Sequence, residues 1–267
     1  MKATMLVLVA MCVALPAPAV PLRWPEGTLR GFPVVRDASG RQIANGTLTQ
    51  WIEDGKLHVT ATYDFEDGRV VEEQTVLQQH PELAQLRWSW EERKGTEVQR
   101  SYSIDFTTGH AVVHKRGEDT LDDHLDDARK PGRAFTGVGF MYAVKNLVPD
   151  LEKGGEIELT AVAFTPGPRT VTVSIRRDQE GSLAMGGRTL AAERFVIHPQ
   201  IPLAFIAKLF VKAPDQYLWF YRPAPPAFLR ADIPLAEPSD PILRIELIGG
   251  PRPPPPQSRR PKAPNRH

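Results

Sequence analysis

Hydrophobic and polar residues alternate with a period of two along much of the chain. In the clearest run, residues 57–65, every odd-numbered position is apolar and the even-numbered positions between them are polar. Such alternation indicates a strand with one apolar and one polar face. Comparable runs recur from Leu29 to about Arg116, with turn dipeptides at Asn45-Gly46, Asp54-Gly55 and Asp67-Gly68. Strands joined by tight turns pair with their neighbours in sequence, so this half of the chain predicts an antiparallel meander.

Residues 117–133 interrupt the alternation. Six carboxylates crowd around His124 in this stretch, which predicts an exposed crossover with room for a helical turn. A helical spacing follows, in which Phe140, Val144, Leu147 and Leu151 fall on one face. Its expected cap is Thr136, and its expected end is at Pro149 and Gly154-Gly155.

Strand patterns return after this helix. They fall at 156–164, 169–176, 188–197, 217–221, 228–233 and 242–248, with turns expected at 166–168 and at Glu180-Gly181. A second short helix is expected at 203–211. The sequence therefore predicts a mainly β protein, in which a twisted antiparallel meander forms a half-barrel or open barrel with one or two short helices.

The two ends of the chain differ from its body. Residues 1–19 combine a positive start, an apolar run and the small-residue site Ala17-Pro18-Ala19, which is the layout of a secretory signal peptide. Residues 251–267 are rich in proline and arginine, which predicts a disordered tail. Residues 20–250 show no compositional linker and are expected to form a single β-rich domain. We therefore expect an exported protein, periplasmic or extracellular, after signal cleavage near Ala19.

Charge and cysteine content narrow the function classes. The single cysteine, Cys12, lies in the expected signal peptide, so the mature chain should have no thiol for a disulfide, a zinc site or a nucleophile. The tail carries five basic residues and no acid, which leaves an acidic body and argues against nucleic acid as a partner. No later apolar run is long enough for a second membrane segment.

Motifs for catalysis or cofactors are absent from the sequence. It contains no Gly-x-Ser-x-Gly elbow, no His-Glu-x-x-His zinc pair and no Gly-x-x-x-x-Gly-Lys nucleotide loop. The acidic stretch around His124 lacks the glycine-centred spacing of a calcium loop. His110 and His114 on one strand would stand about 13 Å apart, too far to share a metal. We predict no cofactor, no metal site and no catalytic residues; a hydrolase built from dispersed acid and base residues stays open.

Aromatic residues are the strongest candidates for a functional role. On the concave face of a curved sheet they would either fill the core or enclose an apolar cavity, and the sequence leaves both alternatives open. The candidate ligand-binding residues are Trp88, Trp90, Phe140, Tyr142, Phe205 and Trp219.

Residues 135–248 resemble a group of bacterial proteins. The resemblance is carried by Phe140-Met-Tyr-Ala-Val-Lys-Asn-Leu-Val-Pro-Asp-Leu-Glu-Lys-Gly-Gly, Leu218-Trp-Phe-Tyr-Arg-Pro, Phe228-Leu-Arg and Ile242-Leu-Arg-Ile-Glu-Leu. These segments resemble uncharacterised bacterial envelope proteins classed as domains of unknown function, which are in turn similar to the lipoprotein-carrier half-barrels of the periplasm. The resemblance implies a curved antiparallel sheet with helices across its open face. The chain departs from the lipoprotein receptors of that group because it lacks a lipobox.

Two functional hypotheses follow. The first is a non-enzymatic envelope protein that binds an apolar, lipid-like ligand or a protein partner through its concave face. The alternative is a structural or assembly protein that contacts an envelope protein or an anionic surface through its basic tail or an exposed strand edge.

Overall fold

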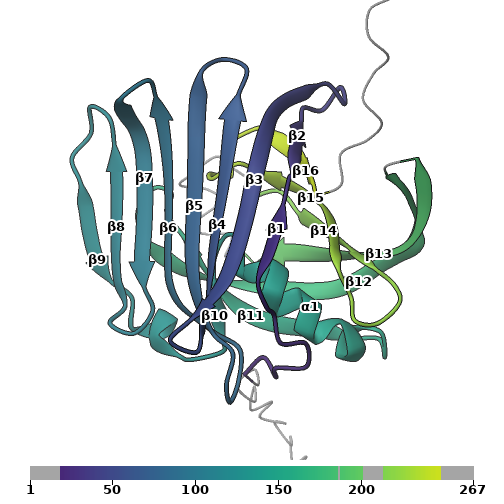
Figure 1. The fold of residues 1–267 in the computed structure, drawn as a ribbon. Helices are drawn as coiled ribbons and strands as arrows, with labels where there is room; N and C mark the ends of the chain where they lie inside the picture. The colour runs from purple at the N-terminus through teal and green to yellow at the C-terminus, as the bar shows by residue number, and fades with distance from the viewer. Residues whose placement is uncertain (1–18, 186, 201–212, 248–267) are drawn as a thin grey trace, which may run out of the picture.

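Antiparallel strands make up most of the computed structural model, which describes residues 19–185, 187–200 and 213–247 (Figure 1). The strands of the first half are β1 (Leu29–Gly31), β2 (Val34–Arg36), β3 (Gln42–Glu53), β4 (Lys56–Phe65), β5 (Arg69–Gln78), β6 (Ala84–Lys94), β7 (Glu97–Asp105), β8 (His110–Lys115) and β9 (Leu121–His124). The strands of the second half are β10 (Ala134–Phe135), β11 (Glu156–Ala163), β12 (Arg169–Met185), β13 (Arg188–Pro199), β14 (Gln216–Tyr221), β15 (Phe228–Pro234) and β16 (Ile242–Glu246).

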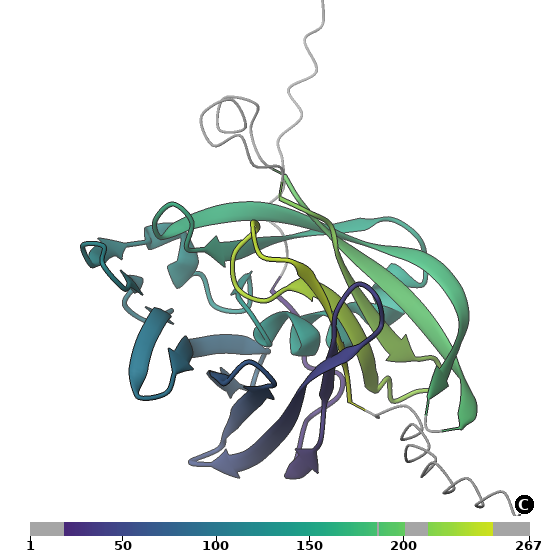
Figure 2. The same ribbon diagram turned by 90° about the horizontal axis from the view of Figure 1, so that it is seen from above.

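Strands β2 to β9 and strands β11 to β16 each form an antiparallel meander, and one long-range pairing joins the two halves. In addition, β1 pairs with β3, and β10 pairs in parallel with β11. Strand β16 pairs with β2 in antiparallel fashion, which makes a single 16-stranded sheet. The edges of the sheet are β9 and β10, so the sheet is not closed. Figure 2 shows both halves curving around helix α1 (Gly139–Leu151). The mainly β fold and the open antiparallel meander are confirmed.

The alternation in the sequence explains which face each strand buries. In β4, Leu57, Val59 and Ala61 are buried, whereas the residues between them keep partial exposure. The apolar faces of both halves and of α1 meet in one core cluster. The buried face of the sheet therefore points toward the inside of the curve, where α1 lies.

Two of the expected turns are wrong. Three are confirmed: Asp54-Gly55, Asp67-Gly68 and 166–168 each connect two consecutive strands. Asp54-Gly55 has the positive φ angles, 50° and 71°, that a tight two-residue hairpin requires. Asn45-Gly46 instead lies within β3, where a Cβ on Gly46 would be 2.8 Å from the carbonyl oxygen of Thr62. That glycine allows a close approach between strands and does not make a turn. Glu180-Gly181 likewise lies inside the long strand β12.

Helix α1 occupies the expected position but has different ends. Thr136 does not cap it; the Thr136 hydroxyl donates to the carbonyl oxygen of Val162 at 2.9 Å. The helix starts after Val138 and continues through Pro149 to Leu151. The crossover before it contains β9 and a short 3₁₀ turn, η1 (Asp126–Arg129).

Several expectations fall outside the described residues: the signal segment 1–18, the second helix at 203–211 and the tail 251–267. The division into a signal peptide, one domain and a tail stays a prediction. Among the described residues, no helix combines the length and the apolar character needed to cross a membrane.

Candidate ligand-binding cavity

A partly open cavity of about 210 Å³ lies between the start of α1 and the inner faces of both halves of the sheet. Strands β3 to β6 of the first half and β11 to β16 of the second half contribute to its wall. The lining is predominantly apolar, because the inward positions of these strands carry valine, leucine, isoleucine, alanine and aromatic residues. Neither meander alone encloses this space, so the site depends on their pairing through β2 and β16.

Stacked aromatic rings form one wall of the cavity. The ring of Trp88 lies 5.2 Å from that of Phe164 at an interplanar angle of 20°. Tyr102 continues the stack, with ring centroids 5.5 Å from Phe164 and 5.3 Å from Trp90. Trp88, Trp90 and Phe164 line the cavity. Because these rings hold each other in place, this wall is rigid and apolar.

Glu73 brings a carboxylate into this apolar space. It points inward from β5, and its Oε1 accepts hydrogen bonds from Trp88 Nε1 at 2.7 Å and from the backbone N–H of Val138 at 2.6 Å. Burial raises the pKa of Glu73 and outweighs these two hydrogen bonds, which lower it. The side chain keeps partial exposure because it faces the cavity.

Gly137 makes this arrangement possible. It has a φ of 51°, and a Cβ at this position would lie 2.0 Å from Glu73 Oε1 and 2.3 Å from Trp88 Nε1. A side chain there would displace the carboxylate or the indole. The glycine therefore lets the segment before α1 close over the Glu73–Trp88 hydrogen bond.

Arg169 is the basic residue of the lining. It is the first residue of β12 and shares its inward face with Val171 and Val173. Burial lowers the pKa of Arg169. Glu73 supplies the carboxylate and Arg169 the guanidinium among the described lining residues.

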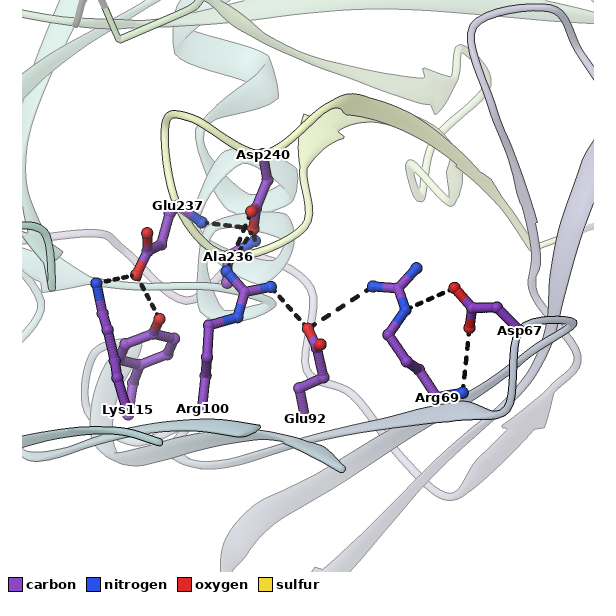
Figure 3. Close-up of polar contacts among 9 residues, drawn as sticks. Asp67, Arg69, Glu92, Arg100, Lys115, Ala236, Glu237 and Asp240 are labelled. Carbon is purple, nitrogen blue, oxygen red and sulfur yellow. Dashed lines mark hydrogen bonds and ion pairs between the residues drawn. The ribbon is translucent and has the colours of Figure 1, made fainter. Parts of the chain in front are cut away.

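A group of ion pairs, here called the clasp, fixes the β15–β16 loop (235–241) against the first half of the sheet (Figure 3). The clasp consists of Glu92, Arg100, Lys115, Glu237 and Asp240. Arg100 contacts Glu92 at 2.6 Å and Asp240 at 3.0 Å, and Lys115 contacts Glu237 at 2.6 Å. Because residues of the loop line the cavity, the clasp holds part of the cavity wall in position.

Further hydrogen bonds reach the carboxylates of the clasp. The hydroxyl of Tyr102 donates to Glu237 Oε1, and Asp240 Oδ2 accepts from the backbone N–H groups of Ala236 and Glu237 at 3.0 Å each. Burial alone would raise the pKa of Glu237, but the hydrogen bonds from Lys115 and Tyr102 hold it below its ordinary value. Despite burial, the hydrogen bond with Glu92 and the charge of Asp240 raise the pKa of Arg100.

The structure brings together part of the ligand-binding set expected from the sequence. Trp88, Trp90 and Phe140 line the cavity. Tyr142 is buried in the core below it, where its hydroxyl donates to Gln50 Oε1 at 2.8 Å.

Trp219 does not lie on the concave face, so its expected placement is wrong. Its neighbour Leu218 lines the cavity, and alternation turns Trp219 to the opposite face, where it packs with Met185 and Leu229. Phe205 lies outside the described residues.

Two charged residues of the lining, Glu73 and Arg169, are not among the ligand-binding residues expected from the sequence. Glu73 lies on β5 two positions from each of the buried residues Val71 and Thr75. Because side chains alternate along a strand, this spacing places its carboxylate on the apolar face. Arg169 has the same parity as Val171 and Val173. Parity alone does not identify either residue as part of the lining, because charged residues on strands are usually solvated.

Histidine–carboxylate pairs occur at the surface of the described structure. His110 Nε2 lies 2.8 Å from Asp122, and His198 Nδ1 lies 2.7 Å from Asp215. Both imidazoles are half-exposed, and neither lines the cavity. No group of three metal-ligating side chains is found in the described part of the chain.

Comparison with known proteins finds a structural likeness and no activity. No protein-family model matches the chain, and no curated protein matches it. A solved structure, described as a β-barrel-like protein of the domain of unknown function DUF1849 from Brucella abortus, is similar to it. The two share 13% sequence identity over 86% of this chain and 98% of that chain, with a TM-score of 0.48. The expected resemblance to bacterial domains of unknown function is confirmed at this level; the further likeness to lipoprotein carriers stays a prediction.

Proposed function

We propose that this protein is exported to the cell envelope and binds a small or slender apolar ligand in its cavity, without chemical conversion. The observation that carries the proposal is the apolar cavity itself, which lies between α1 and the two halves of the sheet. Concave, mostly apolar spaces with a few polar groups are the usual form of small-molecule sites. The signal-like segment 1–19 supports the envelope location.

The cavity volume limits the size of the ligand. About 210 Å³ exceeds the volume of ~150 Å³ at which an engineered apolar cavity takes up benzene. It is below the roughly 300–1,000 Å³ of sites for drug-sized compounds. A small ring compound or a single alkyl chain therefore fits better than a branched lipid.

The chemistry of the lining favours binding over catalysis. No histidine, serine or cysteine is found among the described residues that line the cavity. The hydroxyl of Thr136 is already bonded to Val162. Without a nucleophile beside a base, the lining supports a binding site.

Two experiments test the proposal: recovery of the bound ligand, and a substitution that fills the cavity. Native mass spectrometry of protein purified from its own envelope should show a bound apolar compound. Ala161→Phe fills the cavity from β11 and should abolish this adduct, whereas Ala191→Phe, at an exposed position of β13, should retain it. A ligand-free protein that also takes up no apolar dye, or equal occupancy in both variants, would refute the proposal.

The edge strand β9 does not favour the edge-strand alternative. The edge strand β9 is exposed throughout and carries Asp122 and Asp123. Charges on an edge strand usually prevent pairing with another chain. Deletion of 251–267 tests the other form of that alternative: a cavity binder keeps its ligand, while a tail-dependent assembly protein loses its partner.

A further inference from the structure

Arg169 is a partly buried arginine of the cavity lining that has no acidic partner. Every aspartate and glutamate of the chain lies within the described residues, since the remaining segments contain none, and none of them forms an ion pair with Arg169. By contrast, Arg100 pairs with Asp240 and Arg230 pairs with Asp232. Loss of hydration at Arg169 is thus not offset by a side-chain charge.

The position of Arg169 suits it to contact a ligand. Its neighbours on the inward face of β12 line the cavity, and so does Ala163, which faces it across the β11–β12 pair. Phe164, the next residue, belongs to the aromatic stack. A molecule that contacts the guanidinium can therefore place an alkyl chain against apolar walls.

We propose that the cavity takes a single-chain amphiphile whose anionic head group pairs with Arg169 and whose chain lies along the aromatic wall. This inference rests on the proposed function and adds the ligand class to it. The planar guanidinium can donate two parallel hydrogen bonds to a carboxylate or to a phosphate oxygen pair. The shared requirement is an anionic oxygen group at the end of one apolar chain.

Glu73 determines which end of the ligand lies in which part of the cavity. Its carboxylate is bonded to Trp88 and Val138 on the other half of the sheet from Arg169. When ionised it repels an anionic head group from that part of the cavity, while Arg169 attracts it. The chain end of the ligand therefore belongs near Glu73 and Trp88.

Isothermal titration calorimetry with three matched probes tests the inference. Decanoic acid, decyl phosphate and decanol share one chain and differ in the head group. The wild-type protein should bind at least one of the two anions about tenfold more tightly than decanol, as expected for a charge-assisted hydrogen bond. Comparison of the two anions identifies which head group the site prefers.

Two arginine variants of the same strand serve as test and control. Arg169→Gln should bring the anions to the affinity of decanol, and Arg169→Lys should restore part of the preference. Arg176→Gln should leave the preference unchanged, because Arg176 lies seven positions further along β12, on the exposed face. Arg169→Gln should fold normally, since it removes a charge without an acidic partner; its thermal unfolding provides the check.

The possible results separate this inference from the proposed function. Equal binding of decanol and the anions by the wild type overturns the role of Arg169 and leaves an apolar binding site. An anion preference that survives Arg169→Gln also overturns it. If none of the three probes binds and no ligand is recovered from the envelope, the proposed function fails, and this inference fails with it.

Discussion

Charged side chains enter two partly buried regions of this molecule, the clasp and the cavity, and their surroundings differ. In the clasp, Arg100 lies between Glu92 and Asp240, and Lys115 and Tyr102 both contact Glu237. In the cavity, Glu73 receives two hydrogen bonds on one oxygen, and Arg169 has no acidic partner.

This difference separates charges that hold the fold from charges that can meet a ligand. A buried charge costs free energy unless it is paired and hydrogen-bonded, and the clasp satisfies this condition within the protein. The cavity satisfies it only in part. The guanidinium of Arg169 keeps its hydrogen-bonding capacity for the head group of a bound molecule. Variants of Arg169 therefore test binding, whereas variants of the clasp test stability.

The largest expected effect is at the glycine beside Glu73. Gly137→Ala should lower the free energy of unfolding by about 3 kcal/mol, because a positive φ and a steric clash act together. Gly154→Ala is the control: its φ is 87° but no atom lies within 4 Å of the added Cβ, so only about 1 kcal/mol is expected. Urea unfolding measures both. Equal losses in the two variants would show that the contact with Glu73 and Trp88 does not matter.

The next effect tests the clasp. Arg100→Ala leaves Glu92 and Asp240 without their cation, and should cost about 2 kcal/mol, less than for a fully buried pair because the guanidinium keeps some exposure. Arg93→Ala, at an exposed pair with Glu91 on β6, should cost less than about 0.5 kcal/mol. Urea unfolding of both variants decides, and a loss at Arg100 no greater than that at Arg93 would contradict a structural role for the clasp.

Local patterns in the sequence predict the strands better than the site. Alternation identifies the buried face of β4, because polar and apolar residues differ there at every step. It fails at 217–221, where all five residues are aromatic or aliphatic, so that Leu218 and Trp219 cannot be assigned to faces from their chemistry. Asn45-Gly46 has turn composition, yet its glycine serves a close contact between strands.

The contacts that complete the site are long-range and leave no local signal. The pairing of β16 with β2 brings together residues about 210 positions apart, as the Arg36–Glu246 hydrogen bond shows. Arg100 and Asp240 of the clasp are 140 positions apart. Neither contact changes the period of hydrophobicity around it, so the cavity between the two halves cannot be derived from one sequence alone.

Glu73 and Glu237 should change the free energy of unfolding in opposite directions as the pH is lowered. The pKa of Glu237 is lowered, so its contribution to stability is present above the ordinary glutamate pKa of about 4.3 and is lost as the pH falls through the folded value. The pKa of Glu73 is raised, so its contribution is present below about 4.3 and is lost as the pH rises through the folded value.

The two glutamine variants isolate these contributions. Relative to Glu237→Gln, the wild type should lose stability on acidification; relative to Glu73→Gln, it should lose stability as the pH is raised. Urea unfolding from pH 3 to pH 7 measures both differences. If the stability difference from wild type changed with pH in the same direction for both variants, the pKa values of Glu73 and Glu237 would not be shifted in opposite directions.

The smallest expected effect compares the tryptophans on the two faces of the sheet. Trp88→Phe removes the indole N–H that donates to Glu73, and should cost about 1 kcal/mol beyond the lost packing. Trp219 Nε1 is buried without a hydrogen-bond partner among the described residues, so Trp219→Phe removes no such bond. In a Glu73→Leu background, urea unfolding should show a cost of Trp88→Phe that is lower by about 1 kcal/mol and an unchanged cost of Trp219→Phe, because only Trp88 loses its partner. If the cost of Trp88→Phe stays the same there, ring packing and not the carboxylate sets the role of Trp88 in the cavity wall.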